Sequence, residues 1–189
     1  MLRSFTRLAK ISYQGHTPKI SPKAWVAKSA DIIGQVEIGD DSSVWYNCVI
    51  RGDADKIVIG KRTNIQDGTV IHCRGGDLGG GVPQSTIIGD DVTVGHQALL
   101  HACILEDRSF VGMQACVMDF ARVESGGMVA AGAMVTGKTV VKSGELWGGR
   151  PAKKMRDLSK EEIEFLKLSA DVYAENGRKH KSGCKEVEE

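Results

Sequence analysis

The chain has 189 residues, with 25 Lys and Arg against 24 Asp and Glu, so its formal net charge is +1. This length suits one domain, and the balanced charge argues against a nucleic-acid-binding protein. No apolar run approaches the roughly 20 residues of a transmembrane helix. The chain contains 23 glycines and only 5% aromatic residues, which indicates short, repeated turns around aliphatic side chains.

Residues 1–17 make up a basic N-terminal segment. It contains Arg3, Arg7 and Lys10, and the first acidic residue of the chain is Asp31. A basic, hydroxyl-bearing and acid-free start is typical of a mitochondrial targeting segment. An ordinary basic leader on a cytoplasmic protein is the alternative, and composition alone leaves both open.

Residues 18–150 are the predicted repeat domain, and over most of residues 30–148 an aliphatic residue recurs every six positions. The longest unbroken run comprises Leu105, Val111, Val117, Val123, Val129, Val135 and Val141. A helix with 3.6 residues per turn cannot keep one face at this period, and a plain strand would repeat every two residues. Six-residue periodicity is typical of a parallel β-helix, in which stacked coils bury their aliphatic residues in a central column. The predicted fold is therefore an all-β solenoid of hexapeptide repeats.

The six-residue register changes at three places. There the step between successive aliphatic residues is nine, seventeen or five (Ile50 to Ile59, Ile71 to Ile88 and Leu100 to Leu105). Such breaks in a solenoid fall on surface loops and often mark the binding face. They bracket the three histidines of the repeat region, which are His72, His96 and His101.

The pattern changes again after residue 150. Residues 151–176 read as a connector followed by a helix over approximately 160–176, because Ser159 and Glu162 form a capping box ahead of apolar residues at helical spacing. Gly177 is the expected end of this helix. Residues 177–189 are polar and are expected to form a tail.

The three histidines follow closely on predicted core residues, so their side chains are expected to point outward. Three neutral imidazoles with an open fourth position make a catalytic zinc site, in which the pKa of bound water falls to about 7. Three unrelated surface histidines are the alternative. The five-residue spacing of His96 and His101 suits neither a helix face nor one face of a strand. If both serve one site, either the backbone between them turns a corner or neighbouring subunits share the site. We expect the flat sides of the solenoid to form a trimer.

Two polar motifs precede the first of these histidines. Arg51 and Asp53 lie in VIRGD, and Gln66 and Asp67 lie in NIQDG. A guanidinium, carboxylates and an amide are the groups expected around metal-binding imidazoles, which they orient through hydrogen bonds. A structural ion pair and a corner cap are the alternative interpretations of the two motifs.

The motifs VIRGD, TNIQDGTVIH, IIGDDVTVGHQALLHAC, VGMQACVMD and ELWGGRPAK occur in this order between about residues 18 and 176. With them, the sequence resembles the γ-class carbonic anhydrases. The phrases SSVWYNCVIRGD and SGELWGGRPAKKMRDLSKEEIEF most resemble the γ-carbonic anhydrase subunits of mitochondrial respiratory complex I. The resemblance implies a left-handed parallel β-helix with a C-terminal α-helix, assembled as a trimer.

The resemblance also implies a reaction and a metal site. The reaction is hydration of CO2 to bicarbonate by zinc-bound hydroxide at a trimer interface. The ligands would be His72 and His101 from one chain and His96 from the next. The metal would be Zn2+, although a three-His site also accepts Fe2+ or Co2+.

Five further residues take roles from the same resemblance. Arg51 and Asp53 match an interface ion pair, Gln66 and Asp67 match residues that position and polarise the hydroxide, and Tyr173 matches a helix residue near the metal. Two positions depart from the family pattern.

The departures concern proton transfer. The archetypal enzyme has glutamates where this chain has Ala54 and Gly75, so fast turnover is in doubt. A structural or assembly module of complex I with little or no activity is therefore the main alternative function. A hexapeptide acyltransferase that uses CoA is a further one, because its relatives share the GRPAK end.

The implied partners and location follow from the same relatives. The chain would form a homotrimer, or a heterotrimer with paralogous γ-carbonic anhydrase subunits, and would associate with the membrane arm of complex I. Its location would be the matrix side of the inner mitochondrial membrane, or the cytoplasm if the chain is bacterial.

Overall fold

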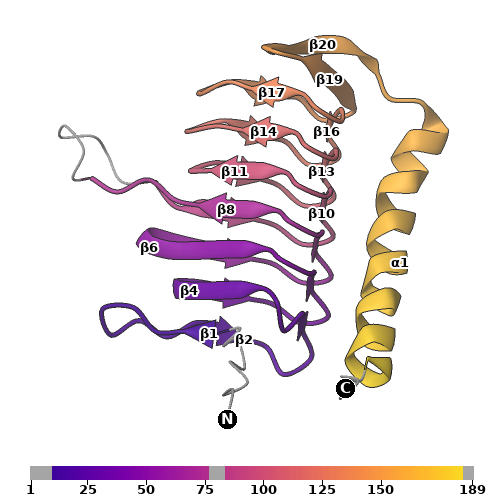
Figure 1. The fold of residues 1–189 in the computed structure, drawn as a ribbon. Coiled ribbons are helices and arrows are strands. Elements are labelled where there is room, and N and C mark those ends of the chain that lie inside the picture. The colour runs from indigo at the N-terminus through magenta and orange to yellow at the C-terminus, as the bar shows by residue number, and fades with distance from the viewer. Residues whose placement is uncertain (1–9, 77–83, 185–189) are drawn as a thin grey trace.

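The computed structural model describes residues 10–76 and 84–184, so Arg3 and Arg7 of the predicted targeting segment lie outside the described residues. The chain forms a parallel β-solenoid of about seven turns with one C-terminal helix alongside it (Figure 1). This architecture confirms the predicted left-handed β-helix of hexapeptide repeats. Within the described residues, no helix is long and apolar enough to cross a membrane.

One side of the solenoid, which we call the helix face, is an eight-stranded sheet. Seven strands are parallel, and β20 (Ala152–Asp157) closes the end of the sheet by pairing antiparallel with β19. The seven are β3 (Trp25–Val26), β5 (Ser43–Val44), β7 (Asn64–Ile65), β10 (Thr93–Val94), β13 (Phe110–Val111), β16 (Met128–Val129) and β19 (Glu145–Gly149).

The other two sides belong to one twelve-stranded sheet. The long strands β4 (Asp31–Ile38) and β6 (Val49–Ile59) take part in both sides. The side we call the histidine face continues from β6 through β8 (Val70–His72), β11 (Leu99–His101), β14 (Cys116–Val117) and β17 (Met134–Val135). The third side continues from β6 through β9 (Thr86–Ile88), β12 (Ile104–Leu105), β15 (Arg122–Val123) and β18 (Val140–Val141).

The N-terminal end of the solenoid is built from two short strands. Both β1 (Lys10–Ile11) and β2 (Lys19–Ile20) pair in parallel with β4. Lys10 and Ile11 of the predicted basic segment 1–17 therefore belong to the solenoid.

The core is the column of aliphatic residues that the six-residue repeat predicts. The short strands of the repeat each turn one such residue inward, and the long strands β4 and β6 turn several. The seven residues from Leu105 to Val141 at six-residue steps are all completely buried. The residues on either side of an inward-pointing residue point outward, because side chains alternate along a strand. This alternation places His72 and His101 on the outer surface, next to buried Ile71 and Leu100.

The helix α1 (Lys160–Gly183) begins where the sequence predicts and ends later. Ser159 and Glu162 form the expected capping box. The helix does not stop at Gly177, and the prediction of a helix over 160–176 was too short. Gly177 is buried in the helix, where a Cβ would lie 3.1 Å from the Cβ of Ser43. This glycine lets the helix approach the solenoid closely, so it serves packing and does not end the helix.

Candidate metal centre

His72 and His101 lie side by side on the histidine face. Parallel pairing of β8 with β11 sets these two residues opposite each other, and their ring centroids are 5.2 Å apart. The same register places Arg51 of β6 opposite His72. One row of outward side chains on three successive coils therefore contains a guanidinium and two imidazoles.

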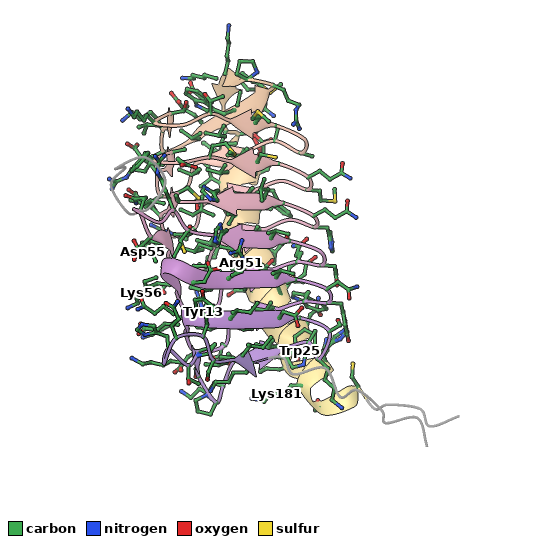
Figure 2. All side chains as sticks on the ribbon, turned by 60° about the vertical axis from the view of Figure 1, so that its left-hand side comes forward. Tyr13, Trp25, Arg51, Asp55, Lys56 and Lys181 are labelled. Carbon is green, nitrogen blue, oxygen red and sulfur yellow. The ribbon has the colours of Figure 1, made fainter. Side chains whose placement is uncertain are left out.

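The carboxylate of Asp53, two residues after Arg51 in β6, lies beside this row. Its Oδ1 lies 2.9 Å from Nε2 of His72, and Oδ2 pairs with the guanidinium of Arg51. Burial alone would raise the pKa of Asp53, but the hydrogen bonds from His72 and Arg51 hold it below its usual range. Figure 2 shows Arg51 on the flat part of β6, and Asp55 and Lys56 at the edge where the strand turns to the next side.

A second carboxylate, which the sequence analysis did not find, holds the other imidazole. Asp119 Oδ1 lies 2.6 Å from Nδ1 of His101, and Oδ2 accepts a hydrogen bond from Arg74 at 3.0 Å. Burial opposes ionisation of Asp119, yet the bonds from His101 and Arg74 keep its pKa below the usual value. The only sequence signal for this contact was the five-residue step after Leu100, which changes the corner beside His101.

The third histidine lies elsewhere, just beyond β10 of the helix face. His96 Nδ1 lies 2.8 Å from Oδ2 of Asp67, whose other carboxylate oxygen accepts a hydrogen bond from the backbone N–H of Tyr46. The structure thus places Asp67 beside His96 and away from the row that contains His72, although the NIQDG motif precedes His72 in the sequence.

Gln66 and Tyr173 belong to this second group. The Gln66 amide donates to Asn64, which donates to Thr93, whose hydroxyl lies 2.9 Å from that of Ser169 in α1. This buried chain of polar side chains ties Gln66 to the helix.

Tyr173 lies one helical turn further along α1. Its ring packs edge-on against Trp45 at 5.6 Å. Burial raises the pKa of its hydroxyl, and the negative charge of Asp67 raises it further. Tyr173 is therefore a neutral hydroxyl close to the carboxylate that holds His96.

The predicted site residues therefore fall into two groups at two edges of the chain. The first group is Arg51, Asp53, His72 and His101, and the second is Gln66, Asp67, His96 and Tyr173. Among the described residues, no side-chain hydrogen bond or ring contact joins one group to the other. Each group contains part of the expected set of three histidine ligands.

The first group fits a zinc ion. Two imidazoles bound tetrahedrally at about 2.0–2.1 Å have ring centroids roughly 5 Å apart, which matches the separation of His72 and His101. Their side chains are 21% and 28% exposed, so the rings remain accessible. Each ring has one nitrogen at a carboxylate and keeps the other for a metal.

A second set of potential ligands overlaps this row but fits a metal less well. Ligand atoms of Asp53, His72 and Cys73 lie within 4.8 Å of one another. The Cys73 thiol, however, is buried and hydrogen-bonds the backbone N–H and C=O of Asp55 at 3.0 and 2.9 Å. Burial raises its pKa, whereas a metal ligand must lose its proton. The imidazoles are the better donors.

Comparison with known proteins shows the family of the chain. The chain is 48% identical over 163 residues to gamma carbonic anhydrase 1, mitochondrial, of Arabidopsis thaliana, and this match covers 86% of the chain but 59% of that protein. It is also 44% identical over 154 residues to a probable carbonic anhydrase of Methanocaldococcus jannaschii, covering 82% of the chain and 92% of the relative. The chain belongs to the γ-class carbonic anhydrase family.

The chain also resembles a solved bacterial structure. A hexapeptide transferase family protein from Anaplasma phagocytophilum is 47% identical, with a TM-score of 0.84 over 90% of this chain and 96% of that one. No family model matches the chain. The chain spans 59% of the length of this Arabidopsis relative, so the activity and partners of the whole protein are matters for proposal.

Proposed function

We propose that this protein hydrates CO2 to bicarbonate at a zinc site shared between adjacent subunits of a trimer. The observation that carries the proposal is the division of the predicted site residues into two incomplete groups. One edge of the chain presents His72 and His101 together, and another presents His96 alone. A zinc ion held by three imidazoles is a Lewis acid that lowers the pKa of water to about 7 and so supplies a nucleophile at neutral pH.

Subunit contact through the histidine face has independent support. The outward residues next to the histidine row are apolar and stand in register on five successive coils. They are Val49, Val70, Leu99, Cys116 and Met134. Val70 and Leu99 are 39% and 36% exposed, although they lie in the middle of a sheet. An apolar strip of this kind is typical of an interface between subunits.

The residues around the imidazoles have distinct tasks in this proposal. Arg51 neutralises Asp53, and Asp53 fixes the ring of His72. Asp67 does the same for His96 on the other edge. These carboxylates hold the rings in one orientation and increase their basicity as ligands.

The second edge contributes the groups that face the reacting molecule. We infer that the amide of Gln66, held by Asn64, and the neutral hydroxyl of Tyr173 would border the shared site and orient CO2 and water by hydrogen bonding. Asp67, the carboxylate of this edge that bonds His96, would accept a hydrogen bond from the attacking water.

Stopped-flow measurement of CO2 hydration tests the proposal. Zinc-loaded protein should hydrate CO2 well above the buffer rate, and His96→Ala should abolish the excess. His16→Ala, which changes a histidine near the N-terminal end of the solenoid, is the matched control. Hydration by the zinc-loaded protein no faster than by His96→Ala would refute the proposal.

One observation favours a second function with little catalysis. The two positions where the archetypal enzyme has glutamates lie side by side here, because a Cβ at Gly75 would lie 3.2 Å from that of Ala54. The chain therefore has neither of the two glutamate carboxylates that would export the proton in the archetypal enzyme, and both positions lie in the same part of the structure. We propose as the alternative that the trimer is a structural or assembly module, with respiratory complex I in mitochondria as its partner.

The location and the partner have their own test. The Arabidopsis relatives are named as mitochondrial, whereas the Methanocaldococcus relative is archaeal. Native complex profiling of the source cells should find the chain in a large membrane assembly under the alternative. A chain found only as a free trimer would contradict it.

A further inference from the structure

We propose that Asp119 is a positioning residue for the metal site, and that Arg74 holds it in place. This inference rests on the proposed zinc site and concerns residues outside the motifs that predicted that site. Asp119 lies 18 positions after His101, one coil further along the solenoid. Its carboxylate touches both the ring of His101 and the guanidinium of Arg74.

A difference in corner length brings Asp119 to His101. Leu100 pairs with Val117, and Ile104 pairs with Arg122. On the coil of His101, three residues (101–103) separate Leu100 from Ile104. On the next coil, four residues (118–121) separate their partners Val117 and Arg122. The corner of this next coil is therefore one residue longer, and Asp119 belongs to it.

The backbone of this longer corner is held on both sides. The N–H of Phe120 donates to Ala102 on the coil below, and the C=O of Asp119 accepts from Lys138 on the coil above. Between these two bonds the carboxylate has little freedom to leave His101. The longer corner therefore holds the Asp119 carboxylate next to Nδ1 of His101.

Arg74 fixes the other side of the carboxylate. Its guanidinium donates to Asp119 at 3.0 Å and lies 5.7 Å from the ring centroid of Phe120. Its own backbone exchanges two hydrogen bonds of 3.0 Å with Gln84. Because Arg74 already restricts the Asp119 carboxylate, this carboxylate loses little further conformational entropy when it bonds the imidazole of His101.

The consequence for His101 is a fixed orientation. With the proton kept on Nδ1 by Asp119, the lone pair of Nε2 is free and its direction is set. Every predicted ligand then has its own carboxylate, since Asp53 bonds His72 and Asp67 bonds His96. Asp119 completes this set.

Zinc affinity measured by chelator competition, together with the visible spectrum of the Co2+-loaded protein, tests the inference without relying on activity. Asp119→Ala should weaken zinc binding by about 10–100-fold, as is usual when such a partner is lost. Asp119→Asn keeps an acceptor oxygen and should lose less. The intensity of the Co2+ absorption should change in the same order.

Asp91→Asn is the matched control. Asp91 also pairs with an arginine at a corner of the solenoid, Arg62, but has no contact with a predicted ligand. This variant should keep wild-type zinc affinity. If Asp119→Ala does not fold, Asp119→Asn and Arg74→Gln supply the same comparison.

The outcomes separate the two proposals. Wild-type zinc affinity and an unchanged Co2+ spectrum in the Asp119 variants would overturn the positioning role while leaving the zinc site intact. Wild-type protein that binds no zinc would overturn both.

Discussion

His72 and His101 face each other across neighbouring coils, with ring centroids 5.2 Å apart and ring planes tilted by 54°. The pairing of β8 with β11 dictates this arrangement, because both residues directly follow a buried aliphatic residue in the same register. A single subunit therefore brings two imidazoles together and keeps the third, His96, at another edge.

The apolar strip on the histidine face predicts how the oligomer depends on one side chain. Leu99→Lys places a charge in the strip and should convert the proposed trimer to folded monomers, because an unpaired charge would be buried at the interface. Sedimentation velocity measures the mass, and circular dichroism checks the fold. Met155→Lys, at a position 63% exposed on β20, should stay trimeric. A Leu99→Lys protein that remains trimeric would contradict contact through this face.

The close approach of α1 to the solenoid predicts an effect of side-chain size at one glycine. Gly177→Leu should destabilise the protein by about 1–3 kcal/mol, the usual cost of overpacking, because the new side chain meets Ser43. Gly183→Leu is the control, since a Cβ there meets no atom of the described residues within 4 Å. Chemical denaturation measures both, and equal stabilities would argue against the packing role of Gly177.

The start of α1 predicts a pH dependence. The hydrogen bond from Arg156, together with that from the Ser159 backbone, lowers the pKa of Glu162 from 4.5 to about 2. A depressed carboxyl pKa stabilises the fold fully above pH 4.5, and this stabilisation is lost as the pH falls toward 2. Glu162→Gln should therefore melt at a lower temperature than wild type at pH 7, and the gap should narrow below pH 4.5. A gap independent of pH would exclude this role.

The missing glutamates predict buffer-dependent turnover. With Ala54 and Gly75 where the archetype has carboxylates, proton export should limit the rate, and an added base with a pKa near the working pH should replace them. The kcat for CO2 hydration should rise with the concentration of an imidazole buffer at constant ionic strength, while kcat/KM should stay constant. A kcat that does not change with the concentration of imidazole buffer would mean that another group of the protein transfers the proton.

The sequence was most informative where the fold repeats. The spacing of aliphatic residues predicted the solenoid, its buried column and the outward direction of His72 and His101, because one local rule acts at each hexad. It also predicted the capping box of Ser159 and Glu162, which depends only on neighbouring residues.

The sequence was least informative where contacts cross between coils or elements. Asp119 escaped notice because its bond to His101 depends on a one-residue difference between two corners. Gly177 looked like the end of a helix because its contact with Ser43 is visible only once the helix is packed. Gln66 is connected to α1 by a chain of hydrogen bonds that begins at Asn64, and no local sequence pattern predicts that chain.

Mixed trimers test the shared site most directly. His96→Ala and His101→Ala subunits should each bind no zinc at the site when alone, because each lacks a ligand for every interface. When the two are co-expressed, each mixed trimer should contain one interface with His72 and His101 from one subunit and His96 from the other.

Random assembly of equal amounts should restore roughly a quarter of the wild-type zinc content, together with the corresponding CO2 hydration, if the trimer is cyclic. Zinc content measured by elemental analysis on the whole co-expressed population, homotrimers included, gives the answer. A zinc content no higher than that of either variant alone would contradict a site shared between subunits.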